Sequence, residues 1–212
     1  MNIKESYTAW SSTYDADRNL TRDLGATILK DTFGKHRFGS ILEIGCGTGG
    51  NISFLAGIAD HVHGLDFSEG MLEKARKNVR SDNITLTVGD LTAAWSVGER
   101  TVDLVVCNLV LEHVENLQQI FSEAFRVLKD EGVFFVCELH PFRQYLGGRA
   151  TFRLGEETRE IHAFIHHISD FVRAAGQTGF VLEKFNEYWH EEDTGKPPRI
   201  AMFLFEKINK SN

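Results

Sequence analysis

The chain has 212 residues, of which 42% are hydrophobic and 25% are charged, as in an ordinary globular protein. This length suits one domain with a full hydrophobic core. The net charge of −7 argues against nucleic acid as the main partner, because phosphate binding needs a basic surface. The longest apolar runs have the length of strands, so we expect no membrane-spanning segment and no membrane partner. The N-terminus lacks an apolar signal core and the three cysteines show no pattern, which predicts a reduced, cytoplasmic protein.

The N-terminal part of the chain predicts two helices. In residues 1–20, three aromatic residues share one helical face by their spacing: Tyr7, Trp10 and Tyr14. Such a stripe packs on a core or forms a mobile lid over a pocket, and both interpretations stay open. Residues 20–33 form an amphipathic pattern that ends at Gly34. We group residues 1–35 as an N-terminal helical cap.

Apolar strand patterns and helical patterns then alternate along the chain. The expected strands are residues 40–44, 61–66, 83–88, 102–107 and 133–138, and the expected helices are residues 50–59, 69–79 and 116–128. This alternation implies right-handed β–α–β crossovers and a parallel sheet, which is the α/β fold class.

The alternation stops after Glu138. Residues 152–154 and 158–165 can pair as a hairpin around Gly155, and Ser169 can cap a helix that reaches Gln177. Strands are expected at residues 180–189 and 200–207. A polar loop alone joins them, so they should be antiparallel. We interpret residues 140–166 as a small lid insertion within a single domain of residues 1–212.

The stretch Ile41–Gly50 predicts a strand, a glycine loop and a helix start. Gly45, Gly47 and Gly49 can adopt positive φ and let a ligand touch bare backbone. The free N–H groups of a helix start favour an electronegative ligand group. The stretch therefore predicts a cradle for a nucleotide-like cofactor. We expect Glu43 inside the crevice, where it accepts hydrogen bonds from backbone N–H groups of the loop.

Further polar residues follow the next strands at the same edge of the sheet. Asp66 could accept from both hydroxyls of a ribose, and Asp90 could accept from the amino group of adenine. Asn108 follows the fourth strand. Both aspartates could instead be helix or turn caps. The glycines and Asp66 also fit a dinucleotide fingerprint, so an NAD-dependent oxidoreductase is an alternative. Against it, the chain lacks a second mononucleotide-binding half and ends in an antiparallel pair.

The sequence Leu42–Gly49, read LEIGCGTG, resembles motif I of the class I S-adenosylmethionine-dependent methyltransferases. Four further segments resemble that family's later motifs in the right order: Gly64–Leu72, Val88–Leu91, Asp103–Val114 and Ala124–Gly132. The last segment departs from the pattern in carrying Glu131 where glycine is usual. The resemblance implies a Rossmann-like, doubly wound, seven-stranded and mostly parallel sheet with an antiparallel C-terminal strand.

The same resemblance implies how S-adenosylmethionine would be held. The glycine loop would approach its methionine part, Asp66 its ribose, Phe67 and Met71 its adenine faces, and the Asn108 carbonyl its amino group. Our candidate cofactor-binding residues are Tyr14, Glu43, Gly45, Cys46, Gly47, Gly49, Asp66, Phe67, Met71, Asp90, Leu91, Asn108 and Leu109.

Residues for catalysis and acceptor binding carry weaker patterns. His140 and His113 follow strands and are candidate general bases, although histidines also serve as structural donors. The candidate acceptor-binding residues are Trp10, Arg143, Tyr145 and Arg149. The arginines suggest a lid that recognises an anionic group, or a solvated basic loop. We expect no metal site, because His162 and His166 have no evident third ligand.

The sequence thus predicts an enzyme that transfers a methyl group from S-adenosylmethionine to a small-molecule acceptor and releases S-adenosylhomocysteine. The acceptor would offer an oxygen, nitrogen or carbon nucleophile and could be anionic. The chain would act as a monomer or a homodimer. A non-catalytic cofactor-binding or interaction protein is the alternative outside enzymes.

Overall fold

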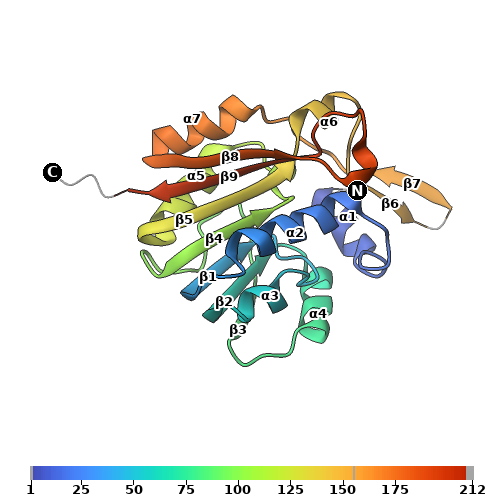
Figure 1. The fold of residues 1–212 in the computed structure, drawn as a ribbon. Coiled ribbons are helices and arrows are strands. Elements are labelled where there is room, and N and C mark those ends of the chain that lie inside the picture. Colours follow the sequence, from blue (N-terminus) through green and yellow to red (C-terminus); the bar gives the residue numbers. More distant parts are fainter. Residues whose placement is uncertain (1, 155, 209–212) are drawn as a thin grey trace.

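A seven-stranded sheet with helices on both faces forms the body of the protein (Figure 1). The computed structural model describes residues 2–154 and 156–208. In spatial order the strands are β3 (Ile84–Val88), β2 (Ala59–Asp66), β1 (Phe38–Ile44), β4 (Val102–Asn108), β5 (Leu128–Leu139), β9 (Ile200–Lys207) and β8 (Phe180–Tyr188). Neighbours from β3 to β5 are parallel, and β9 runs antiparallel to β5 and to β8. The predicted Rossmann-like sheet with an antiparallel C-terminal strand is confirmed.

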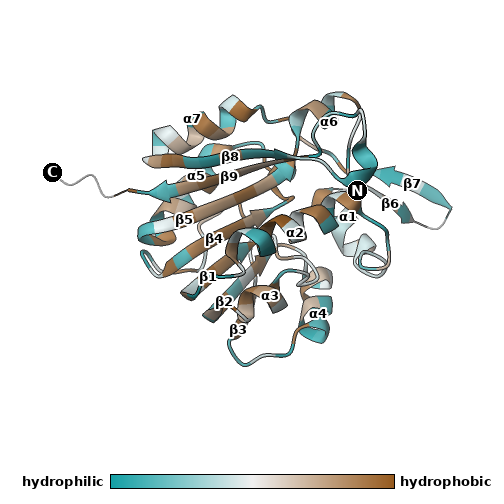
Figure 2. Ribbon diagram, in the orientation of Figure 1, coloured by the Kyte–Doolittle hydropathy of each residue, from teal (hydrophilic) through white to brown (hydrophobic). Residues whose placement is uncertain are grey.

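The helices cover the two faces of the sheet in separate groups. They are α1 (Ile3–Trp10), α2 (Leu20–Phe33), α3 (Ile52–Ala56), α4 (Glu69–Asn78), α5 (Leu117–Val127), α6 (Pro141–Tyr145) and α7 (Ile168–Thr178), with short 3₁₀ turns η1 (Leu111–His113) and η2 (Glu191–Asp193). Side chains of α5 and α7 share one buried apolar cluster with the sheet, and those of α2, α3 and α4 share another. Figure 2 shows the central strands as the most apolar part of the ribbon. Among the described helices, each is too short or too polar to cross a lipid bilayer.

A two-stranded hairpin, β6 (Thr151–Leu154) and β7 (Glu157–Glu160), lies apart from the main sheet. It packs on α1, where the Phe152 ring stacks on Trp10 with ring centroids 5.7 Å apart. Figure 1 shows α1 and this hairpin at the end of the sheet where β1, β4 and β5 terminate. The chain thus brings two sequence-distant segments together over the edge at which α/β sheets bind ligands.

Several element boundaries differ from the sequence prediction for local reasons. The helix after the glycine loop begins only at Ile52, because Gly49 has φ +83° and interrupts helical geometry. β7 ends at Glu160 rather than Ile165, since the Phe164 N–H donates to the Glu112 carbonyl instead of a strand partner. The predicted hairpin turn at Gly155 lies outside the described residues.

Two predicted helix ends also moved. The N-cap of α7 is His167 and not Ser169, because the Asp170 carboxylate accepts the His167 backbone N–H at 2.9 Å. The first aromatic helix ends at Trp10, so Tyr14 follows it in a turn region. Its ring still packs on Trp10, at a centroid distance of 4.8 Å.

Candidate functional site: two adjoining cavities at the strand ends

The glycine loop after β1 opens directly onto a cavity. Gly45 and Gly47 have φ of +67° and +54°, a region that favours glycine. A Cβ on Gly45 would come 2.3 Å from Val110, whereas a Cβ on Gly47 would meet nothing within 4 Å. Gly45 is therefore required by packing, and Gly47 leaves its backbone bare toward the cavity. That is the arrangement which lets a ligand approach the main chain.

Asp66 at the end of β2 fixes this loop. The side chain is buried, and it accepts the Gly47 N–H at 2.9 Å through Oδ2 and the Ser68 N–H at 2.8 Å through Oδ1. Burial raises the pKa of Asp66, while these backbone hydrogen bonds oppose the shift. The carboxylate thus closes a turn before α4, whose N-cap is Ser68, and it also lines the cavity. A turn-capping role and a ligand contact are therefore compatible, and the ligand contact stays a prediction.

Asp90 stands at the other end of the cavity and is exposed. Its Oδ1 accepts both the backbone N–H and the hydroxyl of Thr92, at 2.8 and 2.7 Å. Oδ2 has no hydrogen bond from the described residues. Asp90 therefore has a free oxygen in a fixed position, which suits it to accept from a ligand amine.

Glu43 makes a different contact from the expected one. Its Oε1 accepts the Asn51 side-chain amide at 2.8 Å and takes no backbone N–H of the glycine loop. Asn51 is the N-cap residue of α3, so its side chain ties the start of that helix to β1. Burial raises the pKa of Glu43 to about 8. Its Oε2 is buried without a hydrogen bond from the part of the chain that the structure describes.

Most of the candidate cofactor residues line a single cavity of about 260 Å³. Those that do are Tyr14, Gly45, Gly47, Asp66, Phe67, Met71, Asp90, Leu91, Asn108 and Leu109. Three lie outside it. Glu43 and Cys46 are buried and do not reach the cavity, and a Cβ on Gly49 would come 2.8 Å from Val79 after α4.

The loop after β4 crosses the cavity in a strained conformation. Leu109 has φ +60°, which is uncommon for a residue other than glycine. Its N–H donates to the Cys137 carbonyl at 2.8 Å, and this bond ties the strained residue to β5. The Asn108 side chain packs against Gly25 of α2, where an added Cβ would come 2.6 Å from its Oδ1. The fold thus holds a strained backbone at Leu109, which lines this cavity.

His113 lines the 260 Å³ cavity, and both of its ring nitrogens are engaged. Nδ1 lies 2.9 Å from the His162 carbonyl oxygen and must carry the proton to bond it, so Nε2 accepts from the Tyr7 hydroxyl at 2.7 Å. Burial lowers the pKa of His113, which keeps the ring neutral. Its basic lone pair is therefore occupied by Tyr7 in this structure.

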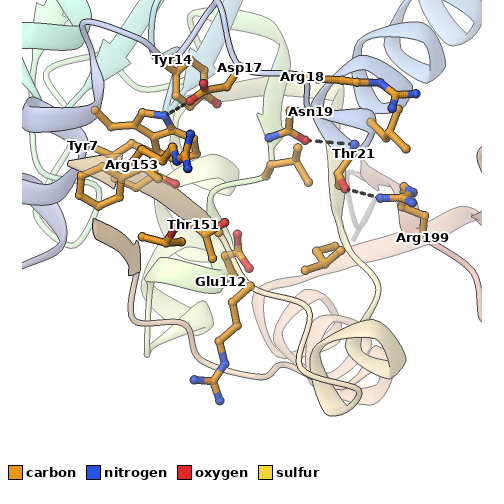
Figure 3. Close-up of a pocket in the computed structure, with 18 residues that line it drawn as sticks. Tyr7, Tyr14, Asp17, Arg18, Asn19, Thr21, Glu112, Thr151, Arg153 and Arg199 are labelled. Carbon is orange, nitrogen blue, oxygen red and sulfur yellow. Dashed lines mark hydrogen bonds between the residues drawn. The ribbon is translucent and has the colours of Figure 1, made fainter. Parts of the chain in front are cut away.

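A larger cavity of about 580 Å³ adjoins the first and shares Tyr7, Tyr14 and Leu109 with it (Figure 3). Of the candidate acceptor residues, Trp10 and Arg149 line this cavity. The Trp10 ring is held in place by a hydrogen bond from its Nε1 to Asp17 Oδ2 at 2.7 Å. The two cavities together offer room for a cofactor and a second molecule beside it.

Arg143 and Tyr145 line neither cavity. The Arg143 guanidinium makes an ion pair of 2.7 Å with buried Asp193, and Tyr145 is exposed beside His167. The anion-binding role predicted for these two residues thus has no geometric support, because α6 directs them away from the strand ends.

His140 also lies outside both cavities. Its Nε2 contacts Glu187 Oε1 at 2.9 Å, and its Nδ1 accepts the Phe142 N–H at 3.2 Å as the N-cap of α6. Both nitrogens therefore serve local structure. The geometry therefore gives no support to His140 as a general base.

Glu112 was missing from the sequence-based candidates, yet it lines the larger cavity and is only 8% exposed. Its Oε2 accepts from the Gln144 side chain at 3.2 Å. Its Oε1 lies 3.7 Å from His113 Nε2, too far for a hydrogen bond. Burial raises the pKa of Glu112 to about 7.

Tyr7 belongs to the aromatic face and Arg153 to the arginine-rich insertion that the sequence indicated as possible lids, but neither was named as a site residue. Tyr7 lines both cavities, and Arg153 lines the larger one. Glu112 lies in the Asp103–Val114 segment that resembles a family motif, next to the candidate base His113. That position in the sequence could have identified Glu112 as a site residue. For Arg153, the crowding of arginines in the insertion was a signal that did not distinguish one arginine from another.

The chain is similar to known proteins in sequence and in fold. Residues 42–136 match the family model described as a methyltransferase domain. An uncharacterized methyltransferase of Emericella nidulans is 26% identical over 86% of this chain and 77% of its own length. Malonyl-[acyl-carrier protein] O-methyltransferase of Priestia megaterium is 26% identical over 98% of this chain and 73% of its own length. An S-adenosylmethionine-dependent methyltransferase of Mesorhizobium loti, 19% identical, has a similar fold with a TM-score of 0.71 over 85% of this chain and 96% of that one.

A doubly wound sheet with a glycine loop and a cavity at its strand ends defines a nucleotide-cofactor enzyme of the α/β class. The matched family model, together with the recognised motifs, narrows that class. The chain is an S-adenosylmethionine-dependent methyltransferase with the class I fold, and residues 42–136 carry its match to the methyltransferase domain.

Proposed function

We propose that the chain binds S-adenosylmethionine in the 260 Å³ cavity and methylates a small molecule held in the adjoining 580 Å³ cavity. The observation that carries this proposal is the convergence of residues from four separate motifs on one cavity beside a second. The acceptor offers an oxygen, nitrogen or carbon nucleophile and can carry an anionic group. The product is S-adenosylhomocysteine.

The residues present fit this cofactor by their chemistry. Gly47 leaves bare backbone toward the cavity, and Phe67, Met71 and Leu91 supply apolar surface for a purine. Asp66 and Asp90 supply carboxylate oxygens for ribose hydroxyls and for the adenine amine. S-adenosylmethionine supplies an electrophilic methyl group when it is bound.

In this proposal the protein contributes mainly alignment. Transfer requires the acceptor atom to sit in line with the methyl group and the sulfur, and holding that geometry lowers the entropic part of the barrier. Tyr7, Tyr14 and Leu109 line both cavities and would set the distance between the two ligands. Residues 1–20 and the insertion of residues 140–166 would act as the lid, with α1 and the β6–β7 hairpin as its contacting parts.

Isothermal titration calorimetry with S-adenosylmethionine, S-adenosylhomocysteine and NAD tests the cofactor. We expect both sulfur nucleotides to bind and NAD to give no heat. Binding of NAD without either sulfur nucleotide would contradict the proposal. A panel of small acceptors, read out as S-adenosylhomocysteine release, then tests the transfer step.

A further inference from the structure

The acceptor cavity contains a buried acid without a cationic partner. Glu112 is 8% exposed, and within the described part of the chain only an uncharged amide, that of Gln144, donates to its side chain. The nearest basic group is neutral His113, at 3.7 Å, whose Nε2 lone pair is taken by Tyr7. A buried carboxylate without a cation or donor is costly, so Oε1 is suited to receive a donor from a ligand.

The same cavity contains a base without an acidic partner. The other arginines on its wall are engaged: Arg149 with Glu160, Arg18 with Glu192, and Arg199 with Asp193. For Arg153, residues 2–154 and 156–208 offer no ion pair. Its guanidinium is thus available for an anionic group.

These two charged residues come from different segments of the cavity wall. Glu112 belongs to η1, whose neighbours Val110 and His113 line the cofactor cavity. Arg153 belongs to β6, and that strand contributes no lining residue there among those described. Figure 3 labels both residues on the wall of one cavity, so a molecule that satisfies both charges would turn its donor group to η1 and its anionic group to the hairpin.

We propose that the acceptor is an amine with an anionic group at its other end, and that Glu112 removes the proton from the amine nitrogen. This inference rests on the proposed function and specifies its acceptor. The aromatic residues that line the same cavity, among them Trp10 and Phe152, would contact the apolar body of the acceptor.

The reaction balances with these groups alone. The ammonium form of the acceptor gives one proton to the Glu112 carboxylate, which leaves a lone pair on nitrogen. That lone pair forms the bond to the methyl carbon as the methyl–sulfur bond breaks, and the electron pair of the broken bond stays on sulfur. Glu112 afterwards releases its proton to solvent. The pKa of Glu112, raised to about 7, lets it hold and release that proton near neutral pH.

Three probes of one size test this acceptor class on the protein saturated with S-adenosylhomocysteine. They are 4-(aminomethyl)benzoate, 4-methylbenzoate, which lacks the amine, and 4-methylbenzylamine, which lacks the carboxylate. We expect 4-(aminomethyl)benzoate to bind at least about tenfold more tightly than either, the scale of one hydrogen-bonded charged group. Ligand-observed NMR and calorimetry measure the three affinities.

Substitutions then assign each end of the probe. Glu112→Gln keeps the shape and an acceptor for Gln144, and should abolish the advantage over 4-methylbenzoate. Arg153→Gln should abolish the advantage over 4-methylbenzylamine. Glu115→Gln and Arg159→Gln, at positions that do not line the cavity, are the matched controls and should change neither.

Equal affinity for the three probes, or no binding of any at millimolar concentration, would overturn the inference. So would an undiminished amine advantage in Glu112→Gln. An advantage for a hydroxyl analogue, 4-(hydroxymethyl)benzoate, over the amine would also overturn it. Failure of the protein to bind S-adenosylhomocysteine in the first titration is a separate result, and it would overturn the proposed function itself.

Discussion

The two aspartates that line the 260 Å³ cavity, Asp66 and Asp90, differ in the hydrogen bonds that they accept from the protein. Asp66 holds the glycine loop through the Gly47 N–H and closes the turn before α4 through the Ser68 N–H, whereas Asp90 bonds only Thr92 among the described residues. Removing Asp66 should therefore disturb both the ligand contact and the loop, while removing Asp90 should remove a ligand contact alone.

We expect Asp66→Ala to weaken S-adenosylhomocysteine binding by roughly 1–3 kcal/mol, the scale of lost hydrogen bonds to a charged group. Asp90→Ala should weaken binding less and leave the melting temperature unchanged. Calorimetry and thermal melting measure the two effects, with Asp82→Ala on the surface as the control. Unchanged affinity in Asp66→Ala would mean that the ribose lies elsewhere.

Because Glu138 of β5 is a buried acid, we predict that the free energy of unfolding depends on pH. Its Oε1 accepts the N–H groups of Val110 and Leu111 at 2.9 and 3.0 Å, and burial raises the pKa of Glu138 to about 8 from 4.5. Between these values the folded protein keeps a proton that the unfolded chain has lost. The free energy of unfolding should therefore fall as pH rises from about 4.5 to about 8.

Glu138→Gln cannot titrate, and its carbonyl can still accept both N–H groups. The variant should lose up to about 1.4 kcal/mol per pH unit of this slope, the limit for one group. Urea denaturation at a series of pH values measures the slope, with Glu183→Gln on the surface as the control. An identical slope in Glu138→Gln and wild type would show that Glu138 ionises normally in the folded protein.

At the scale of elements, the contact between α1 and the β6–β7 hairpin is carried by few side chains. Phe152 is 3% exposed and stacks on Trp10, and these two join Ile161 in a cluster separate from the two main cores. Such small clusters open independently of the sheet.

Phe152→Ala should remove about 3–5 kcal/mol of local packing and release α1 from the hairpin. We expect faster amide exchange in residues 3–10, weaker S-adenosylhomocysteine binding because Tyr7 lines that cavity, and unchanged exchange in β1 and β4. Hydrogen-exchange mass spectrometry measures this, with exposed Phe142→Ala on α6 as the control. Faster exchange in the central strands would show that the hairpin belongs to the main cooperative unit.

Elements with strong periodicity could be predicted from the sequence, and segments governed by distant contacts could not. The central strands and the helices of α2, α4 and α5 follow their hydrophobic patterns. The stretch after β7 has a strand-like alternation, but Phe164 bonds to Glu112, far away in the sequence. The N-cap of α7 is His167 because Asp170 accepts its backbone N–H. The sequence alone favoured Ser169, since serine is a common N-cap residue and lies next to Asp170.

Across the whole molecule, the cofactor cavity could be anticipated better than the acceptor cavity. Parallel strands bring their carboxyl ends to one edge, so residues that follow them meet there by topology alone. The acceptor cavity is built from α1, η1 and the hairpin, whose mutual placement no local pattern specifies. This is why Trp10 and Arg149 lie in it while Arg143 and Tyr145, predicted by the same reasoning, do not.

The position of β9 affects how the protein can be made. It is the last described strand in the chain, yet it lies inside the sheet between β5 and β8. During synthesis β8 has no partner until residues 200–207 have left the ribosome, and β5 exposes a row of unpaired backbone groups for the same time. A nascent chain paused before Ile200 thus presents an open sheet edge to any neighbouring chain, so the speed of translation through these residues bears on aggregation.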